Sequence, residues 1–181
     1  DNCGFYRKQW QYFGVPVQSG AFPFANVAGK ETVNMWDETF NGNKWRPMSG
    51  ALSAFKGYQI TNDAKTEPTG VYNFAGKLNV GDATVALTKT ANVNYSGTNL
   101  VSNSYTAAIP ISADAMTFPA GVEETVYLFN TGTRDQWRKL NGTNIPGYKS
   151  GQYLAVPMNL GGQGDFPDKI PSTHAFMVLK S

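Results

Sequence analysis

The chain is weakly similar to itself, and this internal repeat constrains its fold more than any other feature. Residues 10–18 (WQYFGVPVQ) pair with 98–106 (TNLVSNSYT), 33–48 pair with 126–140, and 56–61 pair loosely with 174–179. In the middle pair, Trp45-Arg46 and Trp137-Arg138 fall at nearly matching offsets. Because self-similarity decides architecture before any single motif does, we predict two related halves, at about residues 1–90 and 91–181. The second half carries an insertion at about residues 141–171.

Alternating apolar and polar residues predict β-strands in both halves. Short apolar runs at 125–129, 152–156 and 174–179 are typical of strands covered on both faces, and 31–36 and 56–61 are weaker candidates. Residues 71–78 and 83–89 alternate around a Gly-containing turn at 79–82, which predicts a β-hairpin. Helical spacing is nearly absent, with single turns expected at 49–55 and 112–118. We therefore predict an all-β, antiparallel, β-sandwich-like (jelly-roll-like) fold with an internal pseudo-repeat.

The composition favours an extracytoplasmic protein, and its charge does not point to any class of binding partner. Charged residues make up only 15% of the 181 residues, the net charge is +2, and no run of Lys or Arg is present. Nucleic-acid binding is therefore not expected, and no segment has the ~18 apolar residues of a membrane helix. The one cysteine, Cys3, cannot form an internal disulfide. The abrupt start DNCGFY suggests a piece of a longer product.

The segment GTNLVSNSYTAAIPI (97–111) resembles a motif, G-W-N-L-[IV]-G-N-P-[YF]-x-S-x-I, of Bacteroidetes cell-surface and secreted proteins. The resemblance continues through TVYLFNTGTRDQW (125–137) and IPSTHAFMV (170–178). In that family the motif often lies upstream of a sorting domain for type IX secretion. The sequence departs from the pattern at Thr98, Ser102 and Ser104, which puts the tightness of the following turn in doubt. The resemblance implies a β-sandwich-like surface module without an established enzymatic role.

Catalytic motifs are absent from the sequence. The single histidine, His174, lies in an apolar run, and no G-x-S-x-G elbow occurs, so a nucleophilic triad is not expected. One His and one Cys cannot supply a zinc cluster, and we expect no cofactor. A glycoside hydrolase needs only two carboxylates flanking the bond, so Asp37, Glu38, Glu123 and Glu124 leave it as the third hypothesis.

Two binding hypotheses rest on residue types. Trp36, Trp45 and Trp137 stand among Arg46, Arg138 and Asp37, as expected of a surface that stacks sugar rings and bonds their hydroxyls. A β core also buries tryptophans, and a duplicated fold repeats its core, so a place in the scaffold core is the favoured interpretation of these rings. Asp165 and Asp168 in a Gly- and Pro-rich loop are a weak candidate for calcium, against a plain flexible loop.

We predict a non-catalytic module of a bacterial cell-surface or secreted protein that serves adhesion, display or structural spacing. A carbohydrate-binding module is the alternative. Its partners would be glycans or neighbouring domains of a larger surface protein, because terminal strands can pair with a neighbouring edge.

Overall fold

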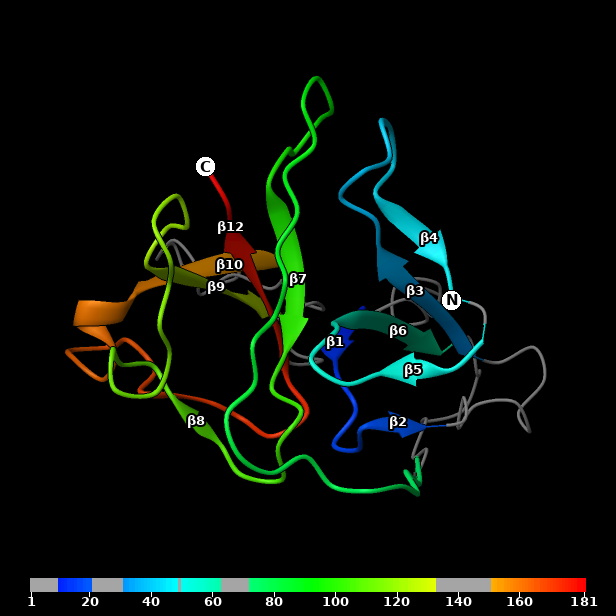
Figure 1. Cartoon of the computed structure of the whole chain (residues 1–181), viewed down its shortest axis with the longest axis horizontal. Coiled ribbons are helices and arrows are strands. Elements are labelled where there is room, and N and C mark those ends of the chain that lie inside the picture. The colour runs from blue at the N-terminus through cyan, green and yellow to red at the C-terminus, as the bar shows by residue number, and fades with distance from the viewer. Residues whose placement is uncertain (1–9, 21–30, 49, 63–71, 133–150) are drawn as a thin grey trace, which may run out of the picture.

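The chain folds almost entirely into antiparallel β-structure, which confirms the predicted all-β class (Figure 1). The computed structural model describes residues 10–20, 31–48, 50–62, 72–132 and 151–181. The first six strands are β1 (Gln11–Phe13), β2 (Ser19–Gly20), β3 (Glu31–Trp36), β4 (Trp45–Pro47), β5 (Leu52–Ser53) and β6 (Tyr58–Asn62). The next six are β7 (Thr98–Ser102), β8 (Ile109–Pro110), β9 (Thr125–Asn130), β10 (Gln152–Pro157), β11 (Lys169–Ile170) and β12 (Ala175–Leu179). A short 3-10 helix, η2 (Met158–Leu160), follows β10.

Two four-stranded sheets dominate the molecule, and each is accompanied by a two-stranded sheet. The large sheets have the orders β1-β6-β3-β4 and β10-β9-β12-β7, and the small ones pair β2 with β5 and β8 with β11. Adding six to each strand number of the first set gives the second, read in the opposite direction: β7-β12-β9-β10 and β8-β11. Figure 1 shows the sheet of β7, β9, β10 and β12 beside that of β1, β3, β4 and β6.

Each large sheet packs over its own apolar core, as the layers of a β-sandwich do. The first core joins Val33 and Ile60 of the large sheet to Leu52 of β5. The second core joins Val126 and Val178 to Ile170 of β11. A third cluster, built around Tyr12, Leu100, Ala175 and Met177, fills the space between the two halves. The opposite faces of the large sheets therefore meet across this third cluster.

The contacts between the halves match one another in position. Two isolated bridges join them, Phe13 to His174 and Lys56 to Val101. Suppose that Phe13 of the first half matches Val101 of the second, and that Lys56 matches His174. Replacing both residues of one bridge by their matches then gives the other bridge. The same offsets bring the ladder pair Tyr12–Gln59 onto the pair Leu100–Met177.

The backbone just before β6 and β12 shows the same correspondence. The amide of Gly14 donates to the carbonyl of Thr173 at 2.7 Å, and the amide of Ser102 donates to the carbonyl of Phe55 at 3.2 Å. Phe55 and Thr173 both adopt left-handed backbone, with φ of 60° and 61°, which is uncommon for residues other than glycine. The two residues therefore share a rare conformation, and the carbonyl of each accepts from an amide of the opposite half.

Buried polar residues at the end of β7 join the halves. Asn103 and Ser104 are completely buried. The Asn103 side-chain amide donates to the carbonyls of Ala107 and Ile170 at 2.8 and 3.0 Å, and the Ser104 hydroxyl accepts from the Phe55 amide at 2.7 Å. These side chains satisfy backbone groups that a turn in the interior would otherwise leave unpaired. This explains the small polar residues at the end of an otherwise apolar strand.

The predicted hairpin at 71–89 is wrong. The described part, 72–89, contains no strand ladder; Leu78 only bridges Val17, while Val80 is 79% exposed. Its backbone bonds to other segments instead, because the Lys77 carbonyl accepts from Gln18 and the Thr88 amide donates to the Asn99 side chain. The segment is a connector between the halves, and its alternating apolar residues did not produce a self-paired sheet.

Two smaller expectations also need correction. Residues 49–55 contain strand β5 where a helical turn was expected, because Leu52 is needed in the first core. Strand β10 is largely exposed, although both faces were expected to be covered; in its sheet it lies at the edge beside β9. The turn expected at 112–118 is present, because the amides of Ala115 and Met116 both donate to the Ser112 carbonyl, at 3.1 and 3.0 Å.

Candidate functional site

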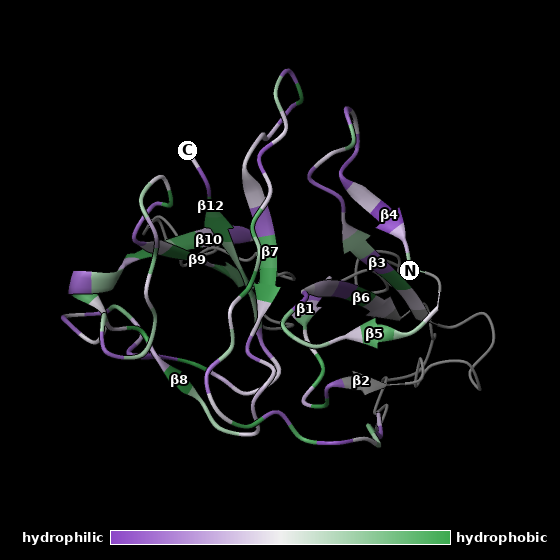
Figure 2. Ribbon diagram, viewed as in Figure 1, coloured by the Kyte–Doolittle hydropathy of each residue, from purple (hydrophilic) through white to green (hydrophobic). Residues whose placement is uncertain are grey.

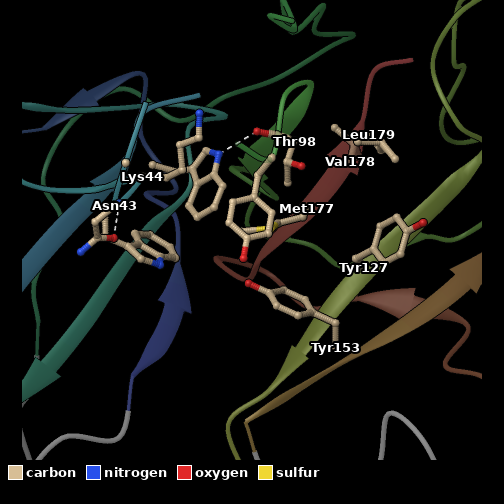
Figure 3. Close-up of a pocket in the computed structure, with 12 residues that line it drawn as sticks. Asn43, Lys44, Thr98, Tyr127, Tyr153, Met177, Val178 and Leu179 are labelled. Atoms are coloured by element: carbon tan, nitrogen blue, oxygen red, sulfur yellow. Dashed lines mark hydrogen bonds between the residues drawn. The ribbon is translucent and has the colours of Figure 1, made fainter. Parts of the chain in front are cut away.

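An aromatic pocket opens between the two halves. It has a volume of about 600 Å³ and is lined chiefly by Trp36, Trp45, Tyr95, Tyr127, Tyr153 and Met177. The tryptophans come from β3 and β4, whereas Tyr127, Tyr153 and Met177 come from the second sheet (Figure 3). Its volume lies within the range of small-molecule sites, about 300–1,000 Å³. We call this cavity the aromatic pocket.

The two tryptophans differ in the hydrogen bonding of their indole N–H groups. The indole N–H of Trp36 donates to the Thr98 carbonyl at 2.7 Å, which ties β3 to the start of β7. Trp45 packs edge-on against Trp36, with ring centroids 5.1 Å apart. Within the described part of the chain, the indole N–H of Trp45 has no hydrogen-bond partner. Trp36 is therefore a structural ring, and Trp45 keeps an uncommitted donor.

A buried carboxylate holds the loop between β3 and β4 in place. Glu38 is only 4% exposed, and its carboxylate accepts from the Thr90 amide and hydroxyl at 2.8 and 2.7 Å and from the Gly97 amide at 2.8 Å. Burial alone would raise the pKa of Glu38, but the hydrogen bonds from Gly97 and Thr90 outweigh it and lower the pKa to about 2. The ionised form therefore fastens one wall of the aromatic pocket to the second half.

Aromatic rings from both halves form the floor between the sheets. Tyr12 of β1 stacks on Phe129 of β9, with centroids 4.4 Å apart. The hydroxyls of Tyr12 and Tyr153 share a hydrogen bond of 2.5 Å. Burial, followed by the neighbouring Tyr153, raises the pKa of Tyr12 well above its usual range. The two phenols therefore stay neutral and act as a fixed contact between the halves.

A second cavity adjoins the first and differs from it in chemistry. This amide pocket has a volume of about 480 Å³ and is lined chiefly by Tyr12, Asn34, Asn43, Trp45, Gln59 and Phe129. Asn43 and Trp45 line both cavities. Lys44 is the only charged side chain among the described residues that line either one, and its ammonium donates to the Glu38 carbonyl at 2.6 Å. Because the two cavities share Asn43 and Trp45, we refer to them together as the groove.

The structure places the predicted binding residues in different surroundings. Trp36 and Trp45 lie together in the groove. Arg46 is not among the groove residues and lies over the Phe40 ring, 4.2 Å from its centroid. The Asp37 carboxylate accepts from the Thr39 hydroxyl and amide at 2.6 and 3.0 Å. The Thr39 hydroxyl is the main cause that lowers the pKa of Asp37. Trp137 and Arg138 fall outside the described residues.

Three of the four carboxylates considered for hydrolysis, those of Asp37, Glu38 and Glu123, accept hydrogen bonds within the protein, and Glu124 is exposed. Glu38 is held ionised as described above, and the Glu123 carboxylate accepts from the Tyr127 hydroxyl at 2.8 Å. Burial lowers the pKa of His174, so its ring is neutral at physiological pH. Asp168 lies 3.4 Å from the Lys169 ammonium. Across the described ranges, no group of three or more His, Cys, Asp or Glu side chains is placed to hold a metal ion.

Sequence reasoning missed the amides of the groove. Asn34 lies between Val33 and Met35, and Gln59 between Tyr58 and Ile60. The apolar neighbours of each amide point into the first core, so the amides point to the opposite face. A polar residue between apolar neighbours in each predicted strand was the available signal.

The chain is similar to part of a known surface protein. It is 59% identical, over 181 aligned residues that include 98% of this chain, to minor fimbrium subunit Mfa5 of Porphyromonas gingivalis. The match covers 15% of the relative's length. No family model matches the chain. No solved structure matches it.

The similarity agrees with the predicted surroundings of the protein. The relative comes from a Bacteroidetes bacterium, and a fimbrium is a cell-surface filament, so the chain is an extracellular, cell-surface protein. Within the described residues, no helix is long and apolar enough to cross the bilayer. The link to type IX sorting stays a prediction.

Proposed function

We propose that the chain is a non-catalytic module of a larger fimbrial surface protein, in which it serves adhesion, display or structural spacing. The observation that carries this proposal is the 59% identity to a segment of a minor fimbrium subunit. The structure is compatible with it because the carboxylates at 38 and 123 are used in structural contacts. Its partners are neighbouring domains of the same protein, other subunits of the filament, and the ligand of the groove.

The internal repeat and the division at about residue 90 belong to the same proposal. The repeat is supported by the shared strand order and by ladders that coincide at constant offsets. These are the offsets of the sequence pairs 10–18 with 98–106 and 56–61 with 174–179. Two similar halves locked face to face form a short, stiff unit, which suits a spacer between other domains.

Immunogold electron microscopy tests the fimbrial role. Antibodies against the purified chain should label surface filaments of intact cells of the source bacterium. Deleting the segment from the chromosomal gene should reduce adherence or shorten the labelled structures while the rest of the protein is still exported. Labelling that requires permeabilised cells, or filaments that carry no gold, would contradict the proposal.

A further inference from the structure

We propose that the groove between the halves binds a neutral saccharide chain, with the amide pocket as its specificity site and Trp45 as its stacking platform. This inference rests on the proposed adhesion function and gives that function a ligand class. Of the predicted binding residues it keeps Trp45 and adds the amides Gln59, Asn34 and Asn43, in place of Arg46. Each of these carries one part of the argument below.

Gln59 presents an unbonded amide to the amide pocket. The residue is 5% exposed and lines that cavity, and its side chain makes no hydrogen bond to any residue in the described ranges. Its counterpart in the second sheet, Met177, is also 5% exposed. A methionine therefore fills the same depth, so packing does not require an amide here. An amide that faces a cavity with its donors and acceptor unused is placed to bind a ligand.

Two more amides stand beside Gln59. Asn34 is its direct cross-strand neighbour in the ladder between β3 and β6, and no described residue bonds to its side chain. Asn43 uses its carbonyl oxygen to accept from the Trp45 amide at 3.1 Å, which leaves its NH₂ group to donate into the groove. An amide side chain offers donors and an acceptor close together. This is the pattern that adjacent sugar hydroxyls require.

Trp45 joins the amides to an apolar surface. Its ring is half-buried and borders both cavities, and Tyr153, 38% exposed, stands across the aromatic pocket. Aromatic faces with a few convergent polar groups match a ligand that has an apolar C–H face and a polar rim. The described lining holds one charged side chain, Lys44, which is itself 2% exposed and bonded to the protein. The groove therefore favours a neutral ligand over an acidic or basic one.

Isothermal titration calorimetry of the full 181-residue chain tests the proposal. The probes are cellohexaose, laminarihexaose, mannohexaose and chitohexaose, each at millimolar concentration. We expect saturable heat with at least one of them. The variant Gln59→Met, which copies Met177, should weaken that binding by about tenfold, the effect of losing one to two hydrogen bonds. Its thermal stability should stay the same, because no described residue bonds to the Gln59 side chain and Met177 fills the matching position in the second sheet.

The matched control is Gln163→Met, the same change at an exposed site outside the groove, which should leave binding unchanged. No heat with any of the four probes, or equal binding by Gln59→Met and the parent, would overturn the proposal. Heat from a tryptic peptide mixture alone would assign the groove to peptides and also overturn it. If the chain adheres to host cells equally well with Gln59→Met, the surface role stands and only the saccharide site fails.

Discussion

The two large sheets present rows of opposite chemistry to the space between them. In the first sheet the row across β1, β6, β3 and β4 reads Tyr12, Gln59, Asn34 and Pro47. In the second sheet the matching row across β7, β12, β9 and β10 reads Leu100, Met177, Tyr127 and Ala155. In Figure 2 the central strands β9 and β12 of the second sheet are mostly hydrophobic, whereas β4 and β6 of the first carry hydrophilic residues.

This difference between the two rows distinguishes residues required for packing from residues available to bind a ligand. The apolar row of the second sheet shows that packing between the halves does not require amides at these positions. The first sheet instead presents the Gln59 amide to the amide pocket, where no described residue bonds to it. A binding role explains an amide at this position. The comparison thus assigns the scaffold to both halves and the binding specificity to one of them.

The largest expected effect breaks the contact where the two halves meet. Gly14 corresponds to Ser102, and a Cβ on Gly14 would overlap the side chain of Ser102 itself. Gly14→Ser should lower the free energy of unfolding by about 3 kcal/mol, because this interior has no room for the added atoms. The measurement is urea unfolding followed by fluorescence.

A double variant that exchanges Gly14 and Ser102 makes the test of this contact more specific. The double variant Gly14→Ser with Ser102→Gly exchanges the two residues across the interface, and it should recover more than half of the loss. Additive losses in the double variant would show that the positions are not equivalent and would count against the repeat.

A second, smaller effect on stability is expected at Glu38, the buried carboxylate of the first half. In the proposed repeat, the position of Glu38 matches Thr131, which cannot supply a carboxylate. The Glu38 carboxylate accepts hydrogen bonds from Thr90 and Gly97. Glu38→Gln should cost about 2 kcal/mol at neutral pH, because the negative charge that these donors stabilise is lost. The exposed carboxylate in Glu124→Gln provides the control, which should unfold like the parent.

The pH dependence of unfolding checks the same residue. The pKa of Glu38 is lowered in the folded state, from an ordinary 4.5 to about 2. Its stabilisation is therefore fully present above about pH 4.5 and is lost as the pH falls toward 2. Glu38→Gln should remove this part of the acid destabilisation. If the unfolding free energy of Glu38→Gln falls with pH as steeply as that of the parent, the stabilising role of Glu38 is contradicted.

The smallest expected effect compares the two left-handed residues. Thr173→Gly should raise the unfolding free energy by about 0.5 kcal/mol, because relief of the backbone strain slightly exceeds the entropy cost of glycine. Phe55→Gly should instead lower it by about 1 kcal/mol, because Phe55 also loses its edge-on contact with Tyr105. Thermal unfolding of both variants measures this, and the same sign in both would contradict the account.

Local sequence patterns predicted where the main strands lie, but which segments pair with one another depends on tertiary contacts. Apolar runs located β9, β10 and β12 because their side chains fill cores wherever the chain pairs. The hairpin at 71–89 failed because its backbone found partners in other segments, which alternation within the segment cannot reveal. The division into halves stays a prediction that the ladders support.

The candidate site was only partly accessible to sequence reasoning for the same physical reason. Trp36 and Trp45 could be named as a pair because large rings dominate either a core or a binding surface. Sequence could not show that Trp36 donates to Thr98 while Trp45 borders two cavities. Nor could it place Gln59 opposite Tyr12, because that pairing joins residues far apart in the chain.

The central claim is that the first sheet's amides, rather than the scaffold as a whole, receive a ligand. Nuclear magnetic resonance of the ¹⁵N-labelled chain tests it, with the best oligosaccharide from the calorimetric panel as titrant. The account predicts that the side-chain amides of Gln59 and Asn34 and the indole N–H of Trp45 shift together and saturate, while the Trp36 indole, bonded to Thr98, stays in place. Shifts confined to other residues, or to the Trp36 indole alone, would contradict it.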